Sequence, residues 1–256
     1  MIDHDALGAS LYNALRSRTT LPPLTGRVPG LTLEDSYRIS EAMLRLRLAD
    51  GERIIGKKIG VTSPAAQEKL GATEPDFGTL TDAMIYQGSV PISEFQRHPR
   101  AEGEIAFTLK HDLLGPGITP SDVLAATETV HPAFEIVDSR IADWQIAIED
   151  TVADNASAGL FVVGEGVPVA GIDFAGCRMV LTTNGSVLSE GRGSNALGSP
   201  LLSMAWLANT LGARGMGLKA GEIILTGSLV PQEPLVAGDH LHVAIEGIGE
   251  TEVRFT

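Results

Sequence analysis

The chain is poor in cysteine and in positive charge, and each shortage excludes a class of protein. One cysteine, Cys177, in 256 residues excludes an intrachain disulfide and is typical of a reducing compartment. Lysine and arginine number 19 against 32 aspartates and glutamates, which gives a formal net charge of -13. Nucleic acids and anionic membranes attract basic surfaces, so neither is expected as a partner.

Long apolar runs are missing as well. No run approaches the roughly 20 residues that a membrane-spanning helix needs. The first five residues, Met1-Ile2-Asp3-His4-Asp5, are acidic, and no signal-peptide apolar segment follows them. A cytoplasmic protein is therefore expected. Apolar residues still make up 43% of the chain, enough for one large domain or for a core domain with a smaller extension.

The first 50 residues carry helix signals. A stripe of apolar residues predicts a helix over residues 3–17. Thr32 is expected to cap a second helix, with Asp35 three residues on completing an approximate capping box. Gly51 ends that helix near Asp50. We therefore predict an N-terminal helical extension over residues 1–52.

From Arg53 onward short strand signals dominate, which predicts a catalytic domain over residues 53–256. Asn184-Gly185 predicts a hairpin turn, and Pro75-Asp76-Phe77-Gly78 a second turn. Many short strands with few helices favour an α+β protein with a mixed or mainly antiparallel sheet system. The expected strands are 54–61, 83–92, 102–110, 133–138, 160–164, 178–183, 186–190, 222–226, 241–246 and 251–255, and the expected helices are 64–70, 120–129 and 199–212.

Two of these strands carry carboxylates. Residues i and i+2 of a strand face the same side, so Glu102 and Glu104 present two carboxylates side by side. Glu135 lies in an apolar run, where a lone charge is costly unless it is paired or binds a metal. Oxygen ligands without cysteine favour Mg²⁺ or Mn²⁺ over zinc. The alternative is ordinary strand alternation, with both carboxylates of residues 102–110 on a solvated face.

Six motifs in this order resemble the 2-hydroxypenta-2,4-dienoate hydratases, in the hydratase/decarboxylase family of the fumarylacetoacetate hydrolase superfamily. They are Gly56-Lys57-Lys58-Ile59-Gly60-Val61-Thr62-Ser63, Pro75-Asp76-Phe77-Gly78, Glu102-Gly103-Glu104-Ile105-Ala106, Glu135-Ile136-Val137-Asp138-Ser139-Arg140, Asp154-Asn155-Ala156-Ser157 and Thr226-Gly227-Ser228. The resemblance implies a small N-terminal helical part, a C-terminal mixed β-sheet roll and a Mg²⁺ or Mn²⁺ site. It implies that Glu102, Glu104 and Glu135 are the metal ligands.

The implied activity is metal-dependent hydration of 2-hydroxypenta-2,4-dienoate to 4-hydroxy-2-oxopentanoate in aromatic meta-cleavage catabolism. Such a reaction needs a general acid or base, and the resemblance implies Lys58. Burial and a nearby metal are expected to lower the pKa of Lys58. The alternative is that Lys57 and Lys58 are a solvated pair, although they face opposite sides of a strand. Asp76 is implied to act with Lys58 in proton transfer or to position water; otherwise it is a turn residue.

The remaining candidates are small hydroxyls and histidines. Ser157 and Thr226 are suited to bind the substrate carboxylate, or equally to cap a local turn. His98 and His131 precede prolines near the acidic motifs and are weaker candidates for metal ligands. Arg140 is expected to form an ion pair with a glutamate or with Asp138.

Three other functions remain open at this point. The first is a 2-oxo-3-hexenedioate (4-oxalocrotonate) decarboxylase, which has the same metal chemistry; Glu-Gly-Glu and Thr-Gly-Ser favour the hydratase over the decarboxylase motifs Glu-Ala-Glu and Thr-Gly-Gly. The second is a C–C hydrolase, disfavoured because no His-Glu pair is found. The third is a non-catalytic partner subunit of a hydratase/decarboxylase complex. The superfamily also implies a homo-oligomer and association with a decarboxylase homologue.

Overall fold

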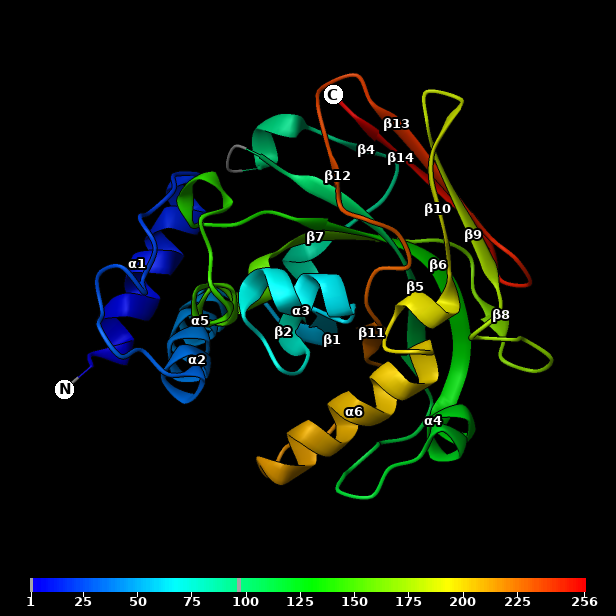
Figure 1. Cartoon of the computed structure of the whole chain (residues 1–256), viewed down its shortest axis with the longest axis horizontal. Coiled ribbons are helices and arrows are strands. Elements are labelled where there is room, and N and C mark those ends of the chain that lie inside the picture. Colours follow the sequence, from blue (N-terminus) through cyan, green and yellow to red (C-terminus); the bar gives the residue numbers. More distant parts are fainter. Residues whose placement is uncertain (1, 96–97) are drawn as a thin grey trace.

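A computed structural model describes residues 2–95 and 98–256. Its N-terminal part is a pair of helices, α1 (His4–Ser17) and α2 (Leu33–Ala49), which lie beside each other at one end of the molecule (Figure 1). The Thr32 hydroxyl accepts from the Asp35 amide and the Asp35 carboxylate accepts from the Thr32 amide, so the predicted capping box is present. Leu11, Ile39 and Met43 form a small core between the helices.

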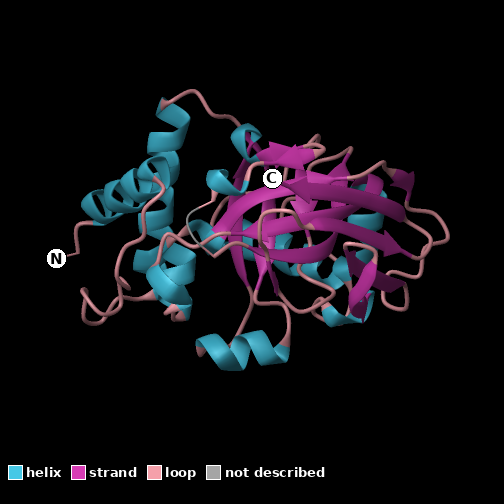
Figure 2. Ribbon diagram, turned by 90° about the horizontal axis from the view of Figure 1, so that it is seen from above, coloured by secondary structure: helices cyan, strands magenta, loops and turns pink. Residues whose placement is uncertain are grey.

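In the rest of the chain strands predominate over helices, which agrees with the expected α+β class (Figure 2). Four further helices interrupt the strands of the described part: α3 (Pro64–Leu70), α4 (Pro120–Ala126), α5 (Ile148–Ala153) and α6 (Pro200–Ala213). The strands are β1 (Ile54–Gly60), β2 (Asp76–Thr81), β3 (Ile85–Tyr86), β4 (Ser89–Val90), β5 (Arg100–Leu109), β6 (Thr127–Val137), β7 (Ala158–Val163), β8 (Val167–Pro168), β9 (Arg178–Thr183), β10 (Ser186–Arg192), β11 (Ile223–Leu225), β12 (Glu233–Pro234), β13 (His240–Ile245) and β14 (Gly249–Phe255).

Within the described residues the strands form two mixed sheets. The larger runs β2-β1-β11-β5-β6-β7-β3, with β12 beside β5 and β8 beside β6. The smaller runs β10-β9-β13-β14-β4. The pairs β1/β11, β3/β7 and β14/β4 are parallel and the other named pairs are antiparallel. The main core includes Phe107, Phe134 and Met179, which joins residues of both sheets in one cluster.

The structure corrects several local predictions. Residues 76–78 begin β2 instead of forming a turn, so Asp76 lies on a strand. The strand expected over 83–92 is broken into a 3₁₀ turn and the two-residue strands β3 and β4. The helix expected over 120–129 ends at Ala126, and β6 begins at the next residue. Helix α5 was not predicted, because its six residues are too few to show a helical period.

The alternative of a solvated carboxylate face on β5 is wrong. Glu102, Glu104 and Ala106 are buried, and Ile105 and Phe107 on the opposite face are buried too. A strand covered on both faces leaves its charged side chains dependent on partners inside the protein. No helix in the described ranges combines the length and apolarity required to cross a bilayer.

Candidate metal and proton-transfer site

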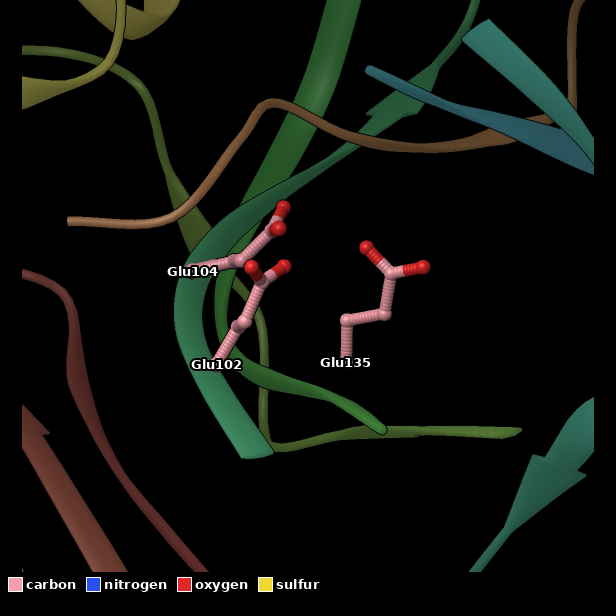
Figure 3. A group of neighbouring side chains, drawn as sticks. All are labelled: Glu102, Glu104 and Glu135. Atoms are coloured by element: carbon pink, nitrogen blue, oxygen red, sulfur yellow. The ribbon is translucent and has the colours of Figure 1, made fainter. Parts of the chain in front are cut away.

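Three glutamates converge where β5 and β6 pair. The antiparallel register places Glu102 directly opposite Glu135, and Glu104 lies two residues along β5 on the same face. One oxygen from each carboxylate lies within 4.8 Å of the others. Figure 3 shows the three carboxylate groups gathered around a common space. Their residues are 8%, 0% and 1% exposed, so this is a buried acidic site.

Electrostatics makes this arrangement unfavourable without a cation. Burial, with the charges of Glu135 and Glu102, raises the pKa of Glu104 well above its ordinary value. Burial raises the pKa of Glu135 to about 7, although Lys58 acts in the opposite direction. Glu104 Oε1 and Glu135 Oε2 accept no hydrogen bond from the described residues, and Glu135 Oε1 faces only the Lys58 amine, 3.2 Å away. Hard oxygen donors left without hydrogen bonds fit a divalent cation that prefers oxygen, so these three residues could hold one.

Two contacts orient the glutamates from outside the group. The backbone amide of Gly227 donates to Glu104 Oε2 at 2.8 Å, and Gln232 Nε2 donates to Glu102 Oε1 at 2.7 Å. Gly227 belongs to a motif quoted from the sequence, but no contact was predicted for it. Gln232 was missed altogether, because it lies between strands in a segment without periodicity. Only the folding of residues 227–232 against β5 reveals both contacts.

Lys58 reaches this site from β1, which lies between β2 and β11. It is 2% exposed, and its Nζ lies 3.2 Å from Glu135 Oε1 and 2.8 Å from the carbonyl oxygen of Ala156. Burial by itself lowers the pKa of Lys58, but the charges of Glu135, Asp76 and the other two glutamates outweigh burial and raise it. Burial therefore lowers the pKa of Lys58 as expected, but the surrounding carboxylates reverse the net shift when no metal is present.

Lys57 points to the opposite side of β1 and lies 3.1 Å from Glu222. The expectation that the two lysines face opposite sides of a strand is therefore confirmed, and Lys58 is the one that lies at the site.

Asp76 lies beside Lys58 because β1 pairs with β2. The register places Gly60 opposite Asp76 and Lys58 opposite Gly78. A Cβ atom added to Gly60 would lie 2.3 Å from Asp76 Oδ1 and 3.2 Å from Lys58 Nζ. Glycine at position 60 therefore leaves room for both side chains, although no direct ion pair or hydrogen bond joins Lys58 to Asp76, both of which are described. Burial raises the pKa of Asp76, with the Lys58 charge acting against it.

The two predicted hydroxyl residues are both buried, and both hydroxyls already have partners. Ser157 Oγ lies 3.0 Å from the Thr151 hydroxyl, where either oxygen can donate. Thr226 Oγ1 donates to the carbonyl oxygen of Ile105 at 2.8 Å. Ser157 can therefore donate to another acceptor when Thr151 donates to it, whereas Thr226 would have to exchange its present hydrogen bond.

The weaker candidates lie outside the site. The His131 ring hydrogen-bonds to Thr108, Thr129 and the carbonyl oxygen of Gly164, and His98 is exposed; neither belongs to the acidic group found in the described residues. Arg140 forms its ion pair with Asp154 instead of a glutamate or Asp138. It contacts Asp138 through that residue's backbone carbonyl.

Comparison with known proteins supports what the buried site indicates. The model of the fumarylacetoacetate (FAA) hydrolase C-terminal family matches residues 57–256. The chain belongs to this family. Curated relatives in the family include a 2-hydroxyhexa-2,4-dienoate hydratase of Comamonas testosteroni, 55% identical over 97% of this chain and 96% of the relative. A 2-hydroxypent-2,4-dienoate hydratase of Pseudomonas putida is 59% identical over 82% of this chain and 96% of the relative.

Among solved structures of fumarylacetoacetate hydrolase relatives, a 4-oxalocrotonate decarboxylase from Pseudomonas putida G7, complexed with magnesium and adipate, superposes with a TM-score of 0.95. It is 34% identical, and the match covers 99% of this chain and 97% of the other. The same decarboxylase complexed with calcium and acetate matches with a TM-score of 0.93. The predicted fold, helical N-terminal part included, is thus confirmed.

Proposed function

We propose that this chain is a metal-dependent hydratase that converts 2-hydroxypenta-2,4-dienoate and water to 4-hydroxy-2-oxopentanoate. The observation that carries the proposal is the meeting of three buried carboxylates with the buried amine of Lys58, 3.2 Å from Glu135. The hydratase names of relatives at 55% and 59% identity support the same activity.

Glu102, Glu104 and Glu135 would hold the metal, which we propose is Mg²⁺ or Mn²⁺. The relevant observation is the set of buried carboxylate oxygens without hydrogen bonds, a donor set that these hard cations prefer. When bound, the cation supplies Lewis-acid stabilisation of negative charge on the C2 oxygen of the substrate. The positive charge would also offset the carboxylates that raise the pKa of Lys58.

Lys58 and Asp76 are proposed to move protons. The substrate loses the proton of its 2-hydroxyl group and gains one at C5, which gives a 2-oxo-3-enoate. Water then adds at C4 while C3 gains a proton. Lys58 Nζ and the Asp76 carboxylate both lie close to Gly60, and a proton would pass between them through one water molecule or through the substrate, because no direct hydrogen bond joins these two residues. The site suits this exchange because its burial keeps competing bulk water away from the amine and the carboxylates.

The substrate carboxylate is proposed to bind near Ser157 and Thr226. Ser157 can donate once Thr151 becomes the donor of their mutual hydrogen bond. Thr226 also fixes the start of the segment that contacts Glu104, since the Gly227 amide follows it directly. We propose further that residues 53–256 are the catalytic unit, that residues 1–52 are a helical extension, and that the chain self-associates, which sedimentation would test.

A paired ultraviolet assay tests the activity. One reaction contains 2-hydroxypenta-2,4-dienoate and the other 2-oxo-3-hexenedioate, each with Mg²⁺ and each repeated with a chelator. Metal-dependent loss of the dienoate, with 4-hydroxy-2-oxopentanoate as product, is the expected result. The hexadienoate homologue belongs in the same assay because one relative is named for it.

The decarboxylase is the second candidate, because the magnesium-complexed structure with a TM-score of 0.95 is a 4-oxalocrotonate decarboxylase. Release of CO₂ from the diacid, with no loss of the dienoate, would move the chain to that activity. The hydratase is favoured because relatives of that name share 55% and 59% of aligned residues against 34% for the decarboxylase. A chain inert toward both substrates would contradict the catalytic proposal and leave a partner subunit.

A further inference from the structure

Three consecutive residues beside the site have left-handed backbone. Asn155, Ala156 and Ser157 have φ values of 55°, 52° and 54°, and none of them is glycine. Residues with a Cβ rarely adopt this conformation, and three in succession persist only where surrounding contacts impose it. Contacts with the surrounding residues must therefore hold residues 155–157 in this turn.

One side of the turn is held by a buried ion pair. Arg140 is 0% exposed and its guanidinium contacts both the carboxylate and the carbonyl oxygen of Asp154. The same guanidinium donates to the carbonyl oxygens of Asp138 at 2.7 Å and Ala158 at 2.8 Å. Ser139 Oγ donates to Asp154 at 3.0 Å. These bonds fix the chain immediately before and after the left-handed residues.

The other side is held by Asn155 against β2. Its Oδ1 accepts from the Thr79 amide at 2.8 Å, and its Nδ2 donates to the Thr79 carbonyl at 2.9 Å. A Cβ atom added to neighbouring Gly78 would lie 2.5 Å from the carbonyl oxygen of Asn155, so the turn lies directly on this strand. Gly78 is the residue that pairs with Lys58.

The result of both restraints is the position of one carbonyl group. Ala156 O accepts a hydrogen bond from Lys58 Nζ at 2.8 Å, and the same Nζ lies 3.2 Å from Glu135. We propose that Arg140, Asp154 and Asn155 are positioning residues, which hold the Ala156 carbonyl against the Lys58 amine and so fix that amine beside Glu135. This inference rests on the proposed function, since it assigns Lys58 a task in proton transfer.

Asn155→Gly tests the proposal, because glycine adopts left-handed backbone freely and the substitution removes only the two bonds to Thr79. Asn209→Ala is the matched control: Asn209, on α6, makes the same pair of bonds to the Ile118 peptide, at 2.8 and 2.9 Å. We expect Asn155→Gly to lower kcat about 100-fold, the effect of displacing a reacting group by about 1 Å. KM and the Mg²⁺ dissociation constant from calorimetry should change little, and Asn209→Ala should keep kcat.

A double-mutant cycle separates positioning from general loss of structure. In the Lys58→Ala background, Asn155→Gly should cause little further loss, because the group that it positions is gone. Equal losses of kcat in Asn155→Gly and Asn209→Ala, or losses that multiply in the Lys58→Ala background, would overturn the proposal. Should the glycine variant not fold, Asn155→Asp is isosteric, keeps the bond from the Thr79 amide, and should lower kcat in the same direction.

Chemical labelling gives a readout that needs no turnover. Acetylation of Lys58, followed by mass spectrometry of its peptide, should be faster in Asn155→Gly than in wild type or Asn209→Ala, because a released amine is more accessible. Unchanged labelling of Lys58 would contradict the positioning role. A wild-type enzyme that fails to hydrate the dienoate would contradict the proposed function, while the labelling result would still report on the turn.

Discussion

The stability of the metal-free protein should fall as the pH rises, because Glu135 is buried among other carboxylates. The pKa of Glu135 is raised from 4.5 to about 7, so the folded state binds more protons than the unfolded state between those values. Unfolding free energy decreases with pH wherever the folded state holds the extra protons. Each pH unit in this window costs about 1.4 kcal/mol, so ionising Glu135 removes about 3 kcal/mol. Glu104, whose pKa is also raised, acts in the same direction.

Thermal unfolding at pH 5 and pH 8 in the presence of chelator measures this effect. Glu135→Gln keeps the size of the side chain but cannot ionise, so the variant should lose less stability between the two pH values. At pH 8 its metal-free Tm should exceed that of wild type by about 6–12 °C. Glu128→Gln is the matched control, since Glu128 lies on the same strand, β6, but is exposed; it should behave like wild type.

Magnesium should reverse the order of the two Tm values at pH 8, so that wild type becomes more stable than Glu135→Gln. A cation bound by ionised carboxylates stabilises the folded state most at high pH, where fewer protons compete. Saturating Mg²⁺ should therefore raise the Tm of wild type at pH 8 and leave Glu135→Gln nearly unchanged. The reasoning fails if the difference in metal-free Tm between Glu135→Gln and wild type does not grow from pH 5 to pH 8.

Three further predictions concern single side chains. Gln232→Leu should weaken Mg²⁺ binding about 10- to 100-fold in calorimetry, because Glu102 loses its donor; unchanged affinity would show that this contact does not orient the ligand. Lys58→Met should lower kcat by about 100- to 10,000-fold and leave a measurable residual rate, while Lys57→Met, on the opposite side of β1, keeps most of kcat; equal losses would remove Lys58 from its proposed role. Native Cys177 should resist thiol reagents, since burial raises its pKa, and Cys177→Ala should keep full activity in the same assay; rapid labelling of the native thiol would contradict this.

Several elements could be predicted because their signals are local. The capping box at Thr32 and Asp35 begins α2 as expected, and Asn184-Gly185 forms the turn between β9 and β10. Strand periodicity placed Glu102 and Glu104 on one face of β5. Asp76 was misassigned to a turn, because the glycine and proline around it carry turn signals, while its pairing with β1 depends on a strand 16 or more residues earlier in the chain.

The residues of the candidate site fall into the same two groups: those that sequence motifs indicated, and those whose contacts depend on distant parts of the chain. The ordered motifs of the sequence resembled those of the family, and that resemblance implied roles for Lys58, Asp76 and the three glutamates. They contained Asn155 without assigning it a role, the ion pair expected for Arg140 was with the wrong acidic residue, and Gln232 was left out. The partners of these three residues lie 76, 14 and 130 positions away along the chain.

The sequence by itself determined the local conformations, the family and the residue types available for chemistry, since caps, turns and alternation act between neighbours in the chain. Only the tertiary structure decided that the β5 carboxylates are buried instead of solvated. The second sheet packs on the opposite face of β5, where Gly103 meets Met179, and the carboxylates are enclosed by distant segments that bring Lys58 and Gln232 to them. The tertiary structure also decided which lysine meets Glu135, and that a left-handed turn after α5 supplies the carbonyl that holds its amine. Those contacts join β1, β6 and residues 155–157, which no local pattern can bring together.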